Sequence, residues 1–152
     1  MHKTIISIIS DTHGILDKSV EEYLSKSDII IHAGDVMSID LIKYLKKNYK
    51  KTYIVAGNND IPERYEHTDD KKLINNLNKI ETFKVFDEII TVTHGDQFGS
   101  MPSHSKLRDT FPDSKLIIYG HTHFQIFDDS ESPWVMNPVS YTHLTLPTNG
   151  TV

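Results

Sequence analysis

The chain has 152 residues, no cysteine and a formal net charge of −5 at pH 7, with a sequence pI near 5.9. A chain of this length buries about 68–70% of its unfolded surface, so one domain is expected, without disulfides or thiolate metal sites. The acidic balance argues against a protein that binds long nucleic acid, because such binding depends on a basic surface.

The first half of the chain alternates short runs of Ile and Val with amphipathic segments. This is the pattern of βα units around a parallel sheet. Strands are expected over residues 4–10, 28–33 and 51–56. Helices are expected over residues 17–25 and 39–48, with N-caps at Asp17 and Ser38.

The second half has a different pattern. Residues 61–78 are polar, which predicts a loop followed by a helix from Asp69. A hairpin with its turn at Asp87-Glu88 is predicted next, then one helix and three further strands, and together these elements predict a mixed or antiparallel second sheet. The predicted ranges are 81–86 and 89–94 for the hairpin, 103–110 for the helix, and 115–119, 124–127 and 134–137 for the strands.

Five of the predicted strands end in Asp, Asn or His beside a glycine. The clusters are "SDTHG" at 10–14, "HAGDV" at 32–36, "VAGNND" at 55–60, "VTHGD" at 92–96 and "IYGHTH" at 118–123. One such cluster would be an ordinary turn. Five are expected to converge, because the carboxyl ends of neighbouring strands line one crevice. The glycines at 14, 34, 57, 95 and 120 allow sharp turns and close approach of the backbone.

The clusters together predict a metal centre. The candidate ligands are Asp11, His13, Asp35, Asn58, His94, His121 and His123. Oxygen and imidazole donors suit Mn²⁺, Fe or Zn²⁺. Seven ligands are too many for one ion that leaves room for substrate, so two divalent ions are expected. The isolated histidines at 2, 32, 67 and 104 are expected in packing or on the surface.

The order of these motifs resembles a known family. D-x-H, G-D, G-N-x-D, H-G and G-H-x-H, followed by Asn137-Pro138, resemble the calcineurin-like metallophosphoesterases, and the short length is similar to their small prokaryotic phosphodiesterase branch. The resemblance covers roughly residues 1–138. It implies a four-layer α/β/β/α sandwich of two mixed sheets, with a dinuclear site at the strand ends.

The resemblance also implies a division of roles among the ligands. One metal would be held by Asp11, His13 and His123, and the other by Asn58, His94 and His121, with Asp35 between them. Mn²⁺ is the expected metal, with Fe, Ni and Zn as alternatives. The implied reaction is hydrolysis of a small phosphate diester, in which a hydroxide shared by both metals attacks phosphorus. Asn58, His94 and Asp60 are the predicted catalytic residues, and Asp60 and Asp96 are expected to orient ligand imidazoles.

One departure from the family concerns the position after Asn58. Many phosphatases of this superfamily carry "GNH", whose histidine protonates the leaving group, whereas this chain has Asn59. An amide cannot act as a general acid near neutral pH. The sequence therefore predicts a preference for good leaving groups, and for diesters over alkyl monoesters.

The second departure follows Pro138, where the chain reads "VSYTHLTLPTNGTV". The family has a glycine in place of Val139, and a β-branched residue resists positive φ. We therefore expect a metallophosphoesterase domain over 1–138 and a non-native tail over 139–152, in which His143 is not a ligand. The fold would then lack its C-terminal strand, and an exposed sheet edge invites lower stability or association, for example as a dimer.

Two other functions fit the sequence less well than the phosphodiesterase. A non-catalytic, protein-binding scaffold on the same fold, like the retromer subunit, would be expected to have lost ligands, and none of the seven is missing here. A nuclease is disfavoured by the acidic balance, although short or cyclic nucleotides stay open as substrates. The chain has no signal peptide pattern and no apolar run of membrane-spanning length, so a cytoplasmic protein with no membrane partner is expected.

Overall fold

The structure, a computed structural model, describes residues 3–138 in full and residues 141–147 by their backbone. The first of its two sheets has the strand order β3-β2-β1-β9. Its strands are β1 (Lys3–Ile9), β2 (Ile29–His32), β3 (Thr52–Ile54) and β9 (Tyr141–Pro147). The first three strands are parallel and β9 runs antiparallel to β1, so this sheet is mixed.

The second sheet is also mixed, with the order β4-β5-β6-β8-β7. Its strands are β4 (Ile80–Val85), β5 (Glu88–Thr93), β6 (Leu116–Ile118), β7 (Ile126–Asp128) and β8 (Trp134–Asn137). β5, β6 and β8 are parallel, while β4 and β7 pair antiparallel at the two edges. The predicted second sheet is thus confirmed.

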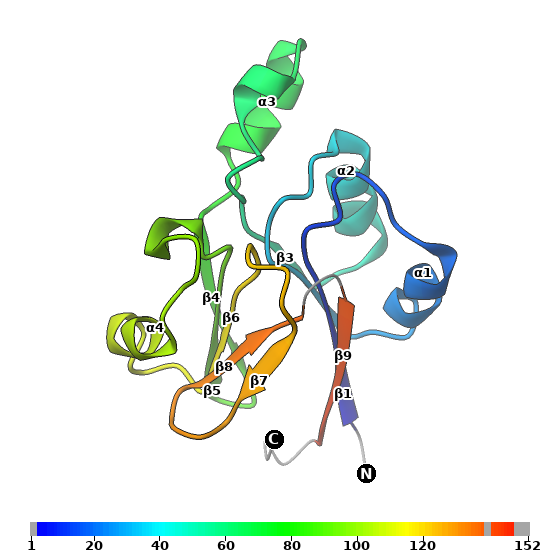
Figure 1. The fold of residues 1–152 in the computed structure, drawn as a ribbon. Helices are drawn as coiled ribbons and strands as arrows, with labels where there is room; N and C mark the ends of the chain where they lie inside the picture. The colour runs from blue at the N-terminus through cyan, green and yellow to red at the C-terminus, as the bar shows by residue number, and fades with distance from the viewer. Residues whose placement is uncertain (1–2, 139–140, 148–152) are drawn as a thin grey trace.

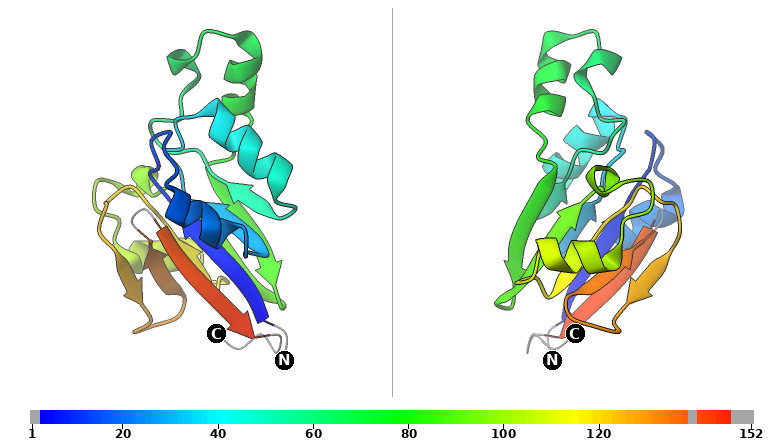
Figure 2. Two further views of the ribbon diagram at one scale, coloured as in Figure 1. Left: turned by 90° about the vertical axis from the view of Figure 1, so that its right-hand side faces the viewer. Right: turned by 60° about the vertical axis from the view of Figure 1, so that its left-hand side comes forward.

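Helices cover the outer face of each sheet, which gives the predicted four layers (Figures 1 and 2). The helices are α1 (Lys18–Leu24), α2 (Ile39–Asn48), α3 (Thr68–Asn75) and α4 (His104–Thr110), with short 3-10 turns η1 (Pro62–Arg64) and η2 (Asp96–Phe98). The first three helices share one apolar cluster with the first sheet, and α4 shares another with the second sheet. None of the described helices is long and apolar enough to cross a membrane.

The central core lies between the two sheets, and β2 shows why the sequence folds this way. Ile29 and Ile31 point into the core between the sheets, whereas Ile30 packs against the helices. A strand that is buried on both faces needs an unbroken apolar run instead of alternation. The run of isoleucines therefore places β2 inside the first sheet.

The element boundaries differ from the sequence prediction in small ways. β7 begins at Ile126, two residues later than predicted. The hairpin turns at Phe86 and Asp87, whose φ values of 49° and 67° are left-handed. The Ser38 hydroxyl caps α2 by accepting from Leu41 N at 3.1 Å, whereas Asp17 precedes α1 without a side-chain cap bond.

The sequence prediction that the fold lacks its C-terminal strand is wrong. Tyr141–Pro147 forms β9, which lies along β1 from Lys3 to Ile9 (Figure 2). The segment contains Tyr141, Thr142 and Thr145, residue types that favour strands, and the open edge of β1 offers unpaired backbone groups. The non-native origin of 139–152 stays a prediction, and residues 139–140 and 148–152 lie outside the described residues.

Candidate metal centre

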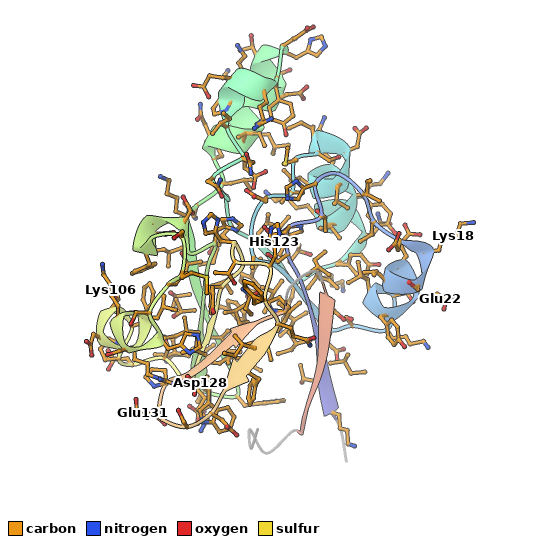
Figure 3. All side chains as sticks on the ribbon, in the orientation of Figure 1. Lys18, Glu22, Lys106, His123, Asp128 and Glu131 are labelled. Carbon is orange, nitrogen blue, oxygen red and sulfur yellow. The ribbon has the colours of Figure 1, made fainter. Side chains whose placement is uncertain are left out.

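The polar clusters meet at one end of the molecule, at the carboxyl ends of β1, β2, β3, β5 and β6. Figure 3 labels His123 there, where the two sheets come together. Backbone hydrogen bonds join the loops: Asp11 N donates to Gly34 O at 2.9 Å, and Gly120 N donates to His94 O at 2.9 Å. The predicted convergence of distant segments is therefore present in the fold.

Several predicted ligands have a backbone conformation that is rare for residues with a side chain. The φ values are 52° for Asp11, 49° for His13, 56° for Asp35, 70° for His121 and 60° for His123. Left-handed conformations cost energy in residues other than glycine, and they gather at functional sites, where the surrounding structure enforces them. The fold thus holds these five side chains in place at a cost in stability.

Asp11, His13 and His123 form a first group whose ligand atoms all lie within 4.8 Å of one another. His123 Nε2 is 3.3 Å from Asp11 Oδ1. The Asp11 side chain is only 5% exposed, whereas the His123 side chain is 60% exposed. This group therefore has a buried carboxylate on the inside and an open side toward solvent.

Asp11, Asp35 and His94 form a second group within the same limit. His94 Nε2 lies 3.5 Å from Asp35 Oδ2 and 3.8 Å from Asp11 Oδ1. Asp35 Oδ2 also lies 3.9 Å from His13 Nε2. Asp11 belongs to both groups, and Asp35 lies between one histidine of each predicted metal set.

His94 provides the test of whether a metal fits. Its Nδ1 is 2.8 Å from Ala33 O, and because a carbonyl only accepts, Nδ1 carries the proton. Its Nε2 is buried and has no hydrogen-bond partner within the described residues. Ligand atoms about 2.0–2.2 Å from a metal lie roughly 3–3.5 Å apart, which is close to the separation of Nε2 from Asp35. A divalent cation would satisfy this nitrogen and both carboxylates.

Protonation competes with such a cation. Burial is the largest influence on His94 and lowers its pKa, but Asp35, the Ala33 carbonyl and Asp11 together outweigh it, so the pKa is raised above 6.5. Burial likewise raises the pKa of Asp35, but the nearby His94 imidazole and the hydrogen bonds from Asn59 bring it below its ordinary value. The carboxylate is therefore ionised and suited to hold a cation.

Asn59, which replaces the family's leaving-group histidine, makes contacts that the sequence did not predict. Its backbone N and its side-chain Nδ2 donate to the two oxygens of Asp35, each at 2.9 Å. Its own Oδ1 accepts from Arg64 Nη2 at 3.0 Å. The departure from the family's GNH motif marked this position in the sequence, but it did not indicate the bonds to Asp35 and Arg64.

Three glycines allow the centre to close around these side chains. A Cβ on Gly57 would lie 2.2 Å from Asp35 Oδ1, and one on Gly34 would lie 2.6 Å from His94 Nδ1. A Cβ on Gly120 would lie 2.2 Å from Ser10 Oγ and 2.9 Å from Asp11 Oδ2. The predicted close approach of backbone is confirmed at these positions.

The prediction that Asp60 orients a ligand imidazole is wrong, while its catalytic role stays a prediction. Its carboxylate accepts from Gly57 N at 2.8 Å, Met37 N at 2.9 Å and Val36 N at 3.2 Å, and so it ties the loop after β3 to the loop after β2. His94 is oriented by the Ala33 carbonyl and not by Asp60 or Asp96. The sequence around a carboxylate in a loop does not indicate which hydrogen-bond donors the carboxylate will meet.

Asn58 and His121 are the two predicted ligands outside these groups. Asn58 is exposed in the turn after β3. The His121 ring lies edge-on to the His94 ring at 5.1 Å between centroids, and its backbone N donates to Asp11 Oδ2 at 3.3 Å. Their role in holding a second metal stays a prediction.

His32 is a buried structural residue. Its Nδ1 accepts from Gly34 N at 3.1 Å, and its Nε2 lies 2.9 Å from Thr12 Oγ1. Burial is the main reason that the pKa of His32 falls from 6.5 to about 3, and the neighbouring His94 lowers it further. His32 therefore joins the loops after β1 and β2 as a neutral imidazole.

The lowered pKa of His32 predicts loss of stability in acid. The unfolded chain binds a proton near pH 6.5 and the folded chain only near pH 3, so the stabilisation is present above 6.5 and is lost as the pH falls toward 3. Between pH 7 and 4.5, His32 should cost about 2–3 kcal/mol of unfolding free energy. Urea unfolding of chelator-treated wild type and His32→Asn at both pH values measures this cost. An equal drop in both proteins would contradict it.

His104, which stands alone in the sequence, belongs to a polar network. Hydrogen bonds from Ser130 and His104 hold the pKa of Asp128 below its ordinary value, and the His104–Asp128 bond is 2.6 Å long. His104 Nε2 is then free to accept from the Tyr119 hydroxyl at 3.1 Å.

Asn137 Nδ2 donates to Gly120 O and Thr122 Oγ1, next to the loop that carries His121 and His123.

Comparisons with known proteins show the family to which the chain belongs. A family model described as the calcineurin-like phosphoesterase superfamily domain matches residues 5–152. A phosphodiesterase of Methanocaldococcus jannaschii is 32% identical over 142 residues, which cover 88% of this chain and 81% of the relative. A probable metallophosphoesterase of the same organism is 32% identical over 145 residues, 91% of this chain and 68% of the relative.

Among solved structures, vacuolar protein sorting 29 from Cryptosporidium parvum has the same fold. The TM-score is 0.74 at 21% identity, and the alignment covers 90% of this chain and 74% of that one. At this identity the likeness concerns the fold alone.

Proposed function

This chain belongs to the calcineurin-like phosphoesterase superfamily and is a metal-dependent phosphoesterase, and we propose that it hydrolyses small phosphate diesters with two bound divalent metal ions. The observation that carries the proposal is the buried, unpartnered Nε2 of His94, which faces the carboxylates of Asp11 and Asp35. Mn²⁺ is the proposed metal, with Fe, Ni and Zn as alternatives. The proposed ligands are Asp11, His13, Asp35, Asn58, His94, His121 and His123.

The metals, when bound, supply charge neutralisation at a phosphoryl group and lower the pKa of water. The chain supplies the positioning. Ala33 fixes the tautomer of His94 so that Nε2 faces the centre, and Asn59 fixes both oxygens of Asp35. The exposed His13 and His123 side chains mark the side from which an ester can enter.

The bonds of Asn59 support the proposed preference for diesters with good leaving groups. One atom of its amide group donates to Asp35 and the other accepts from Arg64. An amide has no proton that it can give up near neutral pH. The leaving oxygen would therefore depart as an anion, which favours nitrophenolate over an alkoxide.

The proposal is tested with p-nitrophenyl mono- and diesters and with an alkyl phosphate, using protein loaded with Mn²⁺. Hydrolysis that requires metal and favours the p-nitrophenyl diester is expected. Equal turnover of activated and alkyl esters would refute the leaving-group preference. Metal-loaded protein without any hydrolysis would favour the non-catalytic scaffold instead.

Asn59→His should restore a proton donor. A general acid contributes about 10²–10⁴-fold, so turnover of alkyl esters relative to p-nitrophenyl diesters should rise by at least about 10-fold. Asn59→Ala is the matched control, because it removes the bond to Asp35 without adding an acid. The same ratio in both variants would count against the role given to Asn59.

A further inference from the structure

We propose that Arg64 binds an anionic phosphoryl oxygen of the substrate, an inference that rests on the proposed phosphodiesterase function. Arg64 lies in η1, within residues 61–78, the segment that projects beyond the strand ends where the centre lies (Figure 1). The contacts of Arg64 connect it to the metal centre.

A short chain of hydrogen bonds joins Arg64 to the predicted bridging carboxylate. Arg64 Nη2 donates to Asn59 Oδ1 at 3.0 Å, and Asn59 Nδ2 donates to Asp35 Oδ2 at 2.9 Å. The amide of Asn59 thus stands between the guanidinium and Asp35. Asn59 therefore holds the guanidinium of Arg64 beside the centre. No ion pair between Arg64 and Asp35 is needed, and such a pair would occupy the oxygens of Asp35.

The backbone that carries Arg64 is tied to the same loops. Asp60 anchors the loop after β3 through three backbone N–H groups, and Pro62 begins η1 two residues later. Arg64 N then donates to Ile61 O at 3.2 Å. A guanidinium on such a restrained backbone loses less entropy when it binds a ligand than one on a mobile loop.

Arg64 also keeps most of its hydrogen-bonding capacity. The chain has two arginines, and the other, Arg108, is buried and bonded to Asp128, Glu131 and the Pro133 carbonyl. Arg64 is exposed, and within the described residues it forms no ion pair and donates one side-chain hydrogen bond, to Asn59. Four of its five N–H groups are therefore available, in a planar arrangement that suits phosphate oxygens.

The experiment compares Arg64→Gln and Arg64→Lys with wild type, all loaded with Mn²⁺. Steady-state hydrolysis of bis-p-nitrophenyl phosphate and calorimetric binding of inorganic phosphate are measured. Loss of a charge-assisted hydrogen bond should raise KM and weaken phosphate binding by about 10-fold in Arg64→Gln. Arg64→Lys should recover part of both, because it keeps the charge but not the fork.

Glu63→Gln, on the same 3-10 turn, is the matched control and should not weaken phosphate binding. Mn²⁺ affinity of Arg64→Gln should stay within about 2-fold of wild type. Unchanged KM and phosphate affinity in Arg64→Gln would overturn the inference while leaving the phosphodiesterase proposal intact. A loss that excess Mn²⁺ restores would also overturn it, since Arg64 would then act through Asn59 on Asp35. A metal-loaded wild type that neither hydrolyses diesters nor binds phosphate would refute the proposed function itself.

Discussion

Asp35→Asn is expected to remove metal binding and diester hydrolysis while leaving the fold intact. Asp35 is 3% exposed, and its Oδ2 faces His94 Nε2 at 3.5 Å and His13 Nε2 at 3.9 Å. Without its charge, the centre loses the carboxylate that lies between the two predicted metal sets. We expect kcat/KM to fall by at least about 10²–10³-fold, the scale of a lost electrostatic contact in an active site.

The same substitution should not unfold the metal-free protein. An asparagine keeps Oδ1 to accept from Asn59 N, and its amide NH₂ faces the unpartnered nitrogen of His94, so the bond from Asn59 Nδ2 is the one that is lost. Metal content by mass spectrometry, kcat/KM and thermal unfolding are the measurements, with Asp129→Asn at an exposed position as control. Asp35→Asn protein that retained both metals and near-normal turnover would show that Asp35 is not a ligand.

Gly34→Ala should impair metal binding and hydrolysis, because a side chain added to this backbone position would displace His94. Gly34 has φ of 101°, and an added Cβ would lie 2.6 Å from His94 Nδ1, so the imidazole would have to move off the Ala33 carbonyl. The backbone conformation should cost about 1–2 kcal/mol and the overpacking about 1–3 kcal/mol of stability. With His94 displaced, metal affinity and kcat/KM should fall by at least about 10²-fold.

Gly99→Ala separates the effect of the strained backbone from the effect of the contact between the added Cβ and His94. Gly99 has φ of 97°, close to that of Gly34, but a Cβ there meets nothing within 4 Å. With a ψ of −176°, Gly99 has a backbone conformation that is essentially restricted to glycine, so the variant should lose about 1–3 kcal/mol of stability and keep its activity within about 2-fold. Urea unfolding, Mn²⁺ titration and diester hydrolysis of both variants make the comparison. Similar losses of activity in the two would show that contact with His94 is not the reason.

Much of the centre could be predicted because its residues are marked by strand ends. Each of Asp11, Asp35 and His94 closely follows an apolar run, and parallel strands bring their carboxyl ends together. The layers were predictable for a similar reason, since apolar runs and amphipathic segments identify strands and their covering helices.

The contacts around the ligands were not predictable in this way. Asp60 meets backbone N–H groups instead of an imidazole, and His104 meets Asp128 and Tyr119, which are 24 and 15 residues away. A carboxylate or an imidazole can form hydrogen bonds with many partners. Which partner it meets depends on which loops lie next to one another. β9 is a further case, because its pairing with β1 joins the two ends of the chain.

The sequence by itself determined the kinds of candidate ligand, their order and the strand ends that bring them together, because local pattern and strand direction suffice for that. Only the tertiary structure decided that Asn59 holds Asp35, that Ala33 fixes the tautomer of His94, and that Arg64 lies beside the centre. Those choices depend on distances of a few ångströms between separate loops, and such distances are set by packing of the whole fold.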